Sequence, residues 1–211
     1  MKKLSEMSLE ELWKLFPITL TEPNPCWKGW YLEEERALKT ALSRKEKIHH
    51  IGSTAVGTIW AKPIVDILVE VPIGSDLSAY KTQIAGLGYL CMSESEKGLS
   101  FNKGYTEQGF AERVFHLHLR YAGDNAELYF RDYLIDHAET AQAYERLKLS
   151  LWKEYEFDRD GYTNAKTEFV QTYTQAGMRL YGNRYHPASQ DFTANATSST
   201  VSGFHQKRQR K

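Results

Sequence analysis

Features of secreted, membrane-spanning and polyanion-binding proteins are scarce in this sequence. Only two of its 211 residues are cysteines, Cys26 and Cys91, and their spacing matches no metal or redox motif. This argues against a disulfide scaffold and favours a reducing compartment. No stretch approaches the roughly 18 consecutive apolar residues that a membrane-spanning helix needs, and no signal-peptide pattern follows the basic residues at the start. We therefore expect a cytoplasmic protein without a membrane partner.

An excess of charge of one sign is also lacking. Lys+Arg and Asp+Glu both total 27, so the formal net charge is zero. This balance makes nucleic acid an unexpected partner, although a local basic groove remains compatible with it. An RNA-associated protein is supported only by the basic residues that end the chain. Residues 187–211 are rich in Ser, Thr, Ala and Gln and are predicted to be a disordered tail.

The apolar pattern predicts one α+β domain over residues 1–186, with an early α/β-like stretch. The chain is 41% hydrophobic and 13% aromatic, which is enough for a globular core. We expect amino-terminal helices within 1–45, a sheet within 46–121 and carboxyl-terminal helices within 126–182. The strands are predicted at 47–51, 64–71, 89–92, 100–103 and 113–121. The helices are predicted between Ser8 and Pro17 and at 27–42, 76–87, 127–137, 140–155 and 162–181.

The first candidate site combines a turn with a buried acid. Gly52, Ser53 and Thr54 follow an expected strand, where a glycine allows close backbone approach and the hydroxyls and free N–H groups of a helix start would bind phosphate. Asp66 lies in the most apolar strand, where a carboxylate is costly to bury without a partner. The pair predicts a cleft with a metal ion or a basic partner. A plain turn and a hydrogen-bonded aspartate form the structural alternative.

The second candidate site is a pair of histidines. His116 and His118 alternate with apolar residues in an expected strand, so both imidazoles share one face of the sheet. Facing a carboxylate, they would form a transition-metal site or a proton-transfer pair. Basic residues would form a phosphate clamp if they converged on one cleft, although each alone is typical of an exposed surface charge. The basic candidates are Lys62, Arg113, Arg120, Arg131, Lys148 and Lys166.

Taken together, these landmarks resemble the GrpB family (glutamate-rich protein GrpB), which is placed in the nucleotidyltransferase superfamily. The resemblance runs from about residue 20 to about residue 182. It is carried by blocks at 50–56, 61–67, 116–118, 130–134, 144–148 and 162–166. One departure is clear, because the family usually reads Val-Pro-Gly-Leu where this chain has Val-Gly-Thr-Ile at 56–59.

The resemblance implies a nucleotidyltransferase-like mixed sheet flanked by helices. Active members of that superfamily follow Gly-Ser with Asp-x-Asp or Asp-x-Glu and a third carboxylate, which together hold two magnesium ions. In this chain Leu68 stands where the second acid would be, and Glu70 lies roughly 13 Å along the strand from Asp66. His116 and His118 stand in place of the third acid. Two-magnesium nucleotidyl transfer is therefore not supported; a single divalent metal (Mg, Mn or Zn) or a metal-free acid–base pair remains.

The sequence thus predicts a protein that binds a nucleotide or another phosphorylated small molecule, with phosphoryl- or nucleotidyl-group transfer as its enzymatic form. The alternative is a non-catalytic ligand-sensing or partner-docking module. The expected ligand contacts are Gly52, Ser53, Thr54, Lys62, Arg131 and Lys166. The expected catalytic residues, which are also the expected metal ligands, are Asp66, His116 and His118.

Overall fold

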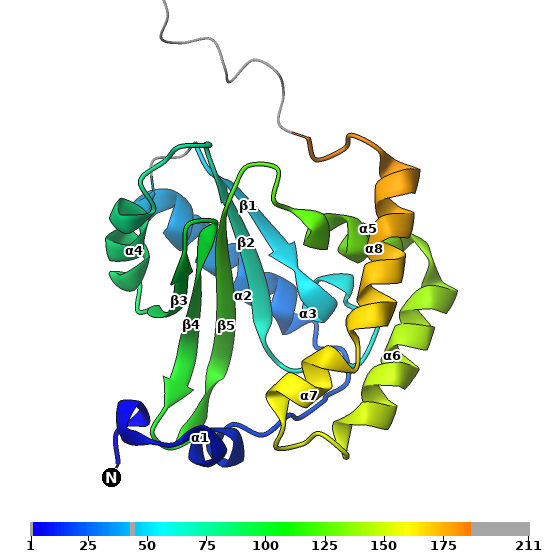
Figure 1. Cartoon of the computed structure of the whole chain (residues 1–211), viewed down its shortest axis with the longest axis horizontal. Coiled ribbons are helices and arrows are strands. Elements are labelled where there is room, and N and C mark those ends of the chain that lie inside the picture. Colours follow the sequence, from blue (N-terminus) through cyan, green and yellow to red (C-terminus); the bar gives the residue numbers. More distant parts are fainter. Residues whose placement is uncertain (1, 43–44, 187–211) are drawn as a thin grey trace, which may run out of the picture.

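The structure, a computed structural model, describes residues 2–42 and 45–186 (Figure 1). The predicted tail over 187–211 lies outside the described residues. The strands are β1 (Lys47–Ile51), β2 (Val65–Val71), β3 (Leu90–Ser95), β4 (Gly98–Thr106) and β5 (Gly109–Tyr121). The helices are η1 (a 3-10 turn, Leu4–Glu6), α1 (Leu9–Leu15), α2 (Cys26–Ala41), α3 (Gly52–Val56), α4 (Leu77–Ala85), α5 (Ala126–Asp136), α6 (Ala138–Trp152), α7 (Arg159–Asn164) and α8 (Thr167–Tyr181).

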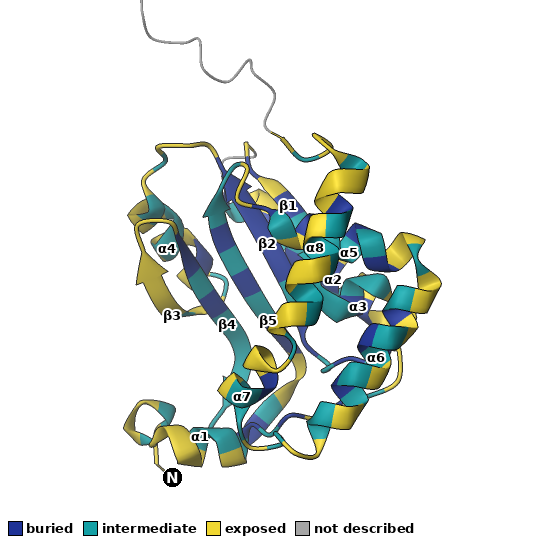
Figure 2. Cartoon of the chain, turned by 45° about the vertical axis from the view of Figure 1, so that its right-hand side comes forward, coloured by how far each residue is buried: buried dark blue, intermediate teal, exposed yellow. Residues whose placement is uncertain are grey.

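The strands form one mixed sheet in the order β1-β2-β5-β4-β3. β2 and β5 are parallel, and every other neighbouring pair is antiparallel. Of the seven residues in β2, only Asp66 is not buried, and Figure 2 shows this strand dark blue along most of its length. The predicted mixed sheet with a buried central strand and a helical carboxyl-terminal portion is therefore confirmed.

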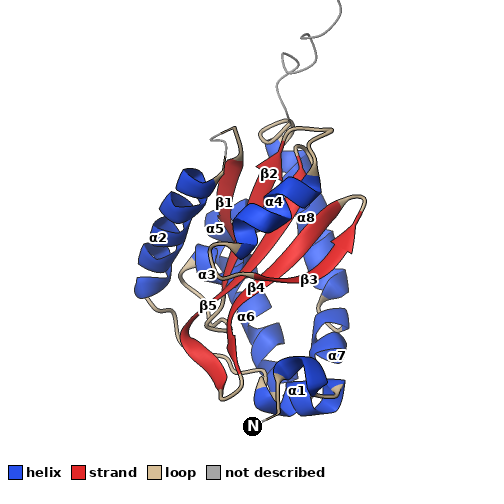
Figure 3. Ribbon diagram, turned by 90° about the vertical axis from the view of Figure 1, so that its left-hand side faces the viewer, coloured by secondary structure: helices blue, strands red, loops and turns tan. Residues whose placement is uncertain are grey.

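The two faces of the sheet carry different side chains. Val65, Ile67 and Val69 pack with Trp27 and Leu38 of α2 in the main apolar core. The alternate residue Leu68 packs on the other face, with Ile51 and Leu128. Figure 3 shows α2 and α4 on the near side of the sheet and α5, α6 and α8 behind it. Because side chains alternate along a strand, Asp66 faces the same side as Leu68.

Some predicted boundaries were wrong. The single helix expected over 162–181 is two helices, separated by a turn at Ala165 and Lys166. α7 begins earlier than expected because Asp158 caps it, accepting a hydrogen bond from the Gly161 amide at 2.8 Å. The strands expected at 89–92 and 100–103 are longer and form a hairpin. β3 was underestimated because it is a largely exposed edge strand without apolar alternation. Among the described helices, none is both long and apolar enough to cross a bilayer.

Candidate functional site

A cavity of about 790 Å³ lies between the sheet and helices α3, α5, α6, α7 and α8. Most of the predicted site residues line it. They are Gly52, Ser53, Thr54, Lys62, Asp66, His118 and Lys166. Lys148, which the sequence grouped only among the general basic candidates, also lines the cavity. The apolar part of the wall includes Phe130, Tyr144, Tyr162, Val170 and Met178.

The acid of β2 lies directly beneath the glycine of the turn. Ile51 pairs with Asp66 across the sheet, so α3 begins over the Asp66 side chain. A Cβ atom added to Gly52 would lie 2.4 Å from Asp66 Oδ2, and Gly52 also has a φ of +71°. Both the contact and the left-handed backbone require glycine. The close approach that the Gly-Ser sequence predicted is therefore an approach to this carboxylate.

Asp66 is held by a chain of side-chain hydrogen bonds. Arg159 Nη1 donates to the Tyr105 hydroxyl at 3.0 Å, and Tyr105 lies 2.8 Å from His116 Nε2. His116 Nδ1 lies 3.2 Å from Asp66 Oδ1. Because an ionised carboxylate can only accept, His116 Nδ1 is assigned the proton that is donated to Asp66, and in this neutral tautomer Nε2 accepts the phenol hydrogen of Tyr105. The chain therefore orients both the imidazole and the carboxylate.

Asp66 stays ionised in this setting. Burial opposes ionisation, but the hydrogen bond from His116, with the electrostatic effects of His116, His118 and Lys62, outweighs it. The pKa of Asp66 is consequently held below its usual range. An ionised carboxylate that faces the cavity is a hydrogen-bond acceptor and a candidate proton acceptor.

Three lysines from separate segments converge on the cavity. Lys62 lies in the loop before β2, Lys148 in α6, and Lys166 in the turn between α7 and α8. Burial lowers the pKa of Lys62 to about 8 and those of Lys148 and Lys166 to about 7, and repulsion from neighbouring cations adds to each shift. Within residues 2–42 and 45–186 none of the three forms an ion pair. The cavity therefore concentrates positive charge.

Two of these lysines are fixed by their neighbours. Lys148 is 3% exposed, and its ammonium donates to Ser53 Oγ at 3.1 Å and to the Trp60 carbonyl. The Lys166 ammonium lies over the Tyr162 ring, 3.8 Å from its centroid. Ser53 Oγ accepts a hydrogen bond from Lys148. The hydroxyl hydrogen of Ser53 can therefore be donated to an acceptor that enters the cavity.

Thr54 reaches the cavity wall, but its hydroxyl is already engaged. It donates to the Ile64 carbonyl at 3.3 Å and lies 3.0 Å from His50 Nε2, which must then be the protonated nitrogen. Burial, with repulsion from Arg131, lowers the pKa of His50 to about 4, so this imidazole is neutral. Thr54 therefore anchors α3 to β1 and to the loop before β2.

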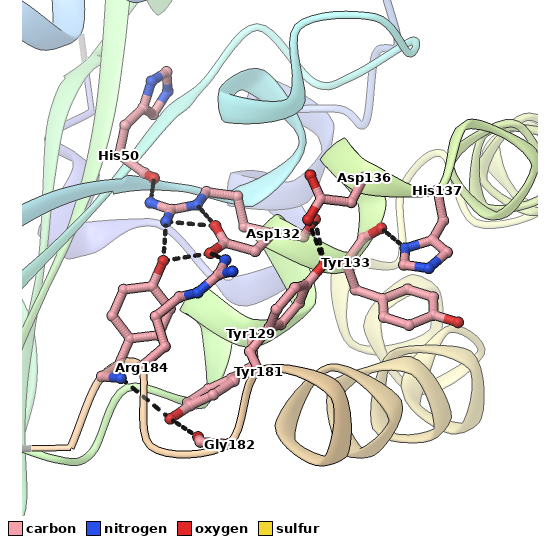
Figure 4. Close-up of polar contacts among 11 residues, drawn as sticks. His50, Tyr129, Asp132, Tyr133, Asp136, His137, Tyr181, Gly182 and Arg184 are labelled. Carbon is pink, nitrogen blue, oxygen red and sulfur yellow. Dashed lines mark hydrogen bonds and ion pairs between the residues drawn. The ribbon is translucent and has the colours of Figure 1, made fainter.

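Arg131 is not brought to the cavity. Its Nη1 donates to the His50 carbonyl at 2.8 Å, while Nε and Nη2 lie 2.9 and 2.6 Å from Asp132 Oδ1. The Asp132 carboxylate also accepts from Arg184 Nη1 at 2.8 Å and from the Tyr185 hydroxyl. Figure 4 shows this cluster joining His50, Asp132 and Arg184. Arg131 thus ties β1 and α5 to the turn after α8.

The acids and histidines do not form a metal centre. His118 pairs in register with Leu68, not with Asp66. Glu70 is occupied by His49 Nε2 at 3.0 Å, the Gly123 amide at 3.0 Å and Asn125 Nδ2 at 2.8 Å. In the described part of the chain, no group of three or more His, Cys, Asp or Glu side chains could hold a metal ion. The residues present therefore do not fit the divalent metal that the resemblance implied.

Two residues of this site, Tyr105 and Arg159, escaped sequence reasoning. Lys148 was named only as one of six basic candidates, although its place in the 144–148 block was a further signal for it. Tyr105 and Arg159 carried no signal, because each is one of many aromatic or basic residues. They meet only where the β4–β5 hairpin approaches α7, and their contact joins positions 54 residues apart.

Comparisons with known proteins agree with one another. A family model described as GrpB protein matches residues 17–176. The UPF0157 protein PA4798 of Pseudomonas aeruginosa is 36% identical over 157 residues, which cover 72% of this chain and 64% of that protein. The UPF0157 protein YqkA of Bacillus subtilis is 30% identical over 185 residues, covering 86% and 53%. The chain therefore spans less than two thirds of the length of these two curated relatives.

One solved structure shows the same likeness. The crystal structure of the conserved protein GrpB from Enterococcus faecalis matches with a TM-score of 0.66 and 29% identity, covering 77% of this chain and 99% of that one. A structure of the Cid1 poly(U) polymerase matches with a TM-score of 0.46 and 9% identity, covering 67% and 44%. A score at that level assigns neither a ligand nor an activity to this chain.

Proposed function

The chain belongs to the GrpB family, and on that premise we propose that its cavity binds the phosphate of a nucleotide or of another phosphorylated small molecule. One observation carries the proposal: the convergence of Lys62, Lys148 and Lys166 on one cavity, without an ion pair among the described residues. Two unit charges 4 Å apart interact by about 4 kcal/mol at an effective dielectric constant of about 20. Bringing three ammonium groups together is therefore unfavourable unless an anion completes the site.

The remaining walls support a ligand with an organic body. The cavity of about 790 Å³ falls within the range of small-molecule sites, which is about 300–1,000 Å³. Phe130, Tyr144 and Val170 provide apolar surface beyond the lysines. Ser53 lies on the polar side, where its hydroxyl hydrogen is available to a phosphate oxygen.

Asp66 supports an enzymatic form of the same proposal. Its ionised carboxylate would accept the proton of an attacking hydroxyl group while that oxygen forms a bond to phosphorus. The bond from phosphorus to the leaving oxygen would break, and a lysine ammonium would supply a proton to the leaving oxygen. His116, held by Tyr105, would orient the carboxylate throughout. This is the metal-free acid–base pair, and no step in it requires a metal.

Calorimetric titration of the purified protein with ATP, pyrophosphate and orthophosphate at low salt tests binding. We expect Lys166→Ala to weaken the affinity for the tightest of these at least tenfold. Lys28→Ala, which removes an exposed lysine of α2, is the matched control and should change little. Absence of binding by all three compounds at millimolar concentration would refute the proposal.

Release of phosphate or pyrophosphate from ATP then separates the two forms of the proposal. In the enzymatic form Asp66→Asn abolishes turnover while binding persists, because the amide cannot accept the proton. Binding by the native chain without any turnover instead supports the ligand-sensing alternative.

A further inference from the structure

The cavity offers a divalent cation little coordination. Magnesium requires near-octahedral oxygen ligands. Thr54 already donates and accepts hydrogen bonds, and Ser53 Oγ already accepts from Lys148. Asp66 Oδ1 accepts from His116, which leaves its second oxygen beside Gly52 as the free acidic oxygen on this wall.

The same space is crowded with fixed positive charge. When all three lysines are protonated, three ammonium groups face the ionised Asp66 carboxylate, which gives an excess of two positive charges. Glu127 also lines the cavity, but burial raises the pKa of its carboxyl group and so opposes its negative charge. Glu145 attracts Lys148 electrostatically, and its carboxylate accepts from the Trp60 amide at 2.6 Å. A divalent cation placed beside Asp66 would meet this excess of like charge.

We infer that Lys62, Lys148 and Lys166 take the place of a divalent cation, so that the cavity binds the metal-free form of a phosphate or diphosphate group with at least two negative charges. This inference rests on the proposed function and adds the charge state of the ligand. A phosphate monoester dianion matches the excess of two charges. A magnesium complex of the same group carries two fewer negative charges and brings a hydrated ion into the cavity.

The three lysines are suited to this role because they come from independent segments. Lys148 is anchored from α6 through Ser53 and the Trp60 carbonyl. Lys166 is directed from the turn between α7 and α8 and rests on the Tyr162 ring. Ammonium groups that approach one anion from different sides can share its oxygens, as the coordination sphere of a metal would otherwise do.

The sign of the effect at Asp66 separates this arrangement from a metal site. If Asp66 held a metal that bridged to phosphate, Asp66→Asn would weaken ligand binding. If the lysines bind the phosphate directly, Asp66→Asn removes a repulsive charge and strengthens binding, by about tenfold. The asparagine Oδ1 can still accept from His116 Nδ1, so the substitution preserves that hydrogen bond.

The experiment measures the dissociation constant of pyrophosphate by calorimetry at constant ionic strength, once in EDTA and once in excess Mg²⁺. We expect binding in EDTA to be as tight as in Mg²⁺ or tighter, and Asp66→Asn to tighten it further. Glu96→Gln removes the same charge from an exposed residue of the β3–β4 turn and should leave the affinity unchanged.

Three results would overturn the inference. Binding that requires Mg²⁺, Mn²⁺ or Zn²⁺ would refute it while leaving the proposed function intact. Loss of binding in a folded Asp66→Asn protein, checked by its thermal melting, would do the same. No binding of pyrophosphate, ATP or orthophosphate under any condition would instead refute the proposed function itself.

Discussion

Replacement of Gly52 by alanine tests how tightly the turn and the acid are fitted together. The residue needs glycine for two separable reasons. Its φ of +71° places it in the left-handed region, and a Cβ atom at this position would lie 2.4 Å from Asp66 Oδ2. Gly57 has the same backbone conformation, with φ of +74°, but no atom lies within 4 Å of its added Cβ. The two glycines therefore form a matched pair in neighbouring turns of one segment.

The expected magnitudes follow from this difference. Gly57→Ala should cost only the left-handed strain, about 1–2 kcal/mol of unfolding free energy. Gly52→Ala should cost the same strain plus about 1–3 kcal/mol for forcing a methyl group against a side chain that cannot move freely. Because His116 holds Asp66 on its other side, the carboxylate cannot withdraw without losing that hydrogen bond. Ligand affinity should fall in Gly52→Ala and remain near the native value in Gly57→Ala.

Urea denaturation of both variants gives the two free energies, and calorimetry gives the affinities. A double-mutant cycle with Asp66→Ala isolates the contact, since removing the carboxylate should recover about 1 kcal/mol or more of the Gly52→Ala penalty. If Gly52→Ala is no less stable than Gly57→Ala, or if Asp66→Ala recovers nothing, the carboxylate does not lie beneath the turn as described.

Four further outcomes are expected. Burial lowers the pKa values of Lys148 and Lys166 to about 7, and anions bind the charged form of these lysines. Ligand binding should therefore take up protons near neutral pH, and it should weaken as the pH rises from 7 to 9. Calorimetry in buffers of different ionisation enthalpy measures the proton uptake. Above pH 7 the unfolded chain binds more protons than the folded chain, because the charged form of Lys166 is disfavoured by burial. Lys166→Met should therefore stabilise the unliganded protein at pH 7 by about 1 kcal/mol, as measured by urea denaturation. Unchanged stability would contradict the burial of this charge. Tyr105→Phe removes the donor to His116 Nε2 and should redistribute the imidazole tautomers in nitrogen NMR spectra; an unchanged spectrum would contradict the hydrogen-bond chain. Asp132→Ala removes the ion-pair partner of Arg131 and Arg184 and should destabilise the protein by about 3 kcal/mol with unchanged ligand affinity. A loss of ligand affinity without a loss of stability would indicate that Arg131 contributes to ligand binding.

The sequence predicted the sheet well, and placed the acid and the histidines on strands, because both depend on short-range patterns. A β-branched run identifies β2, and alternation places His116 and His118 on one face. The parallel register that sets Asp66 opposite His116 could not be predicted from the sequence, since register depends on how the intervening 49 residues return to the sheet.

The lysines show a different limit of sequence reasoning. Apolar spacing continues across residues 162–181, so the pattern predicts one helix and misses the turn that directs Lys166 into the cavity. Arg131 was a reasonable candidate by residue type, but its donors are used by Asp132 and the His50 carbonyl. Tertiary packing alone decides which basic residues line the cavity and which form ion pairs with a carboxylate.

Leu68 has a consequence for any attempt to engineer this protein. The side chain is fully buried against Ile51 and Leu128, in a small second core that holds α5 to the sheet. Introducing an aspartate there to build a two-magnesium centre would bury a carboxylate in hydrocarbon surroundings. Glu70, the acid two residues further along β2, is already committed to three donors. Converting this scaffold to two-metal chemistry would therefore require redesigning the packing beneath α5, and a single substitution cannot achieve it.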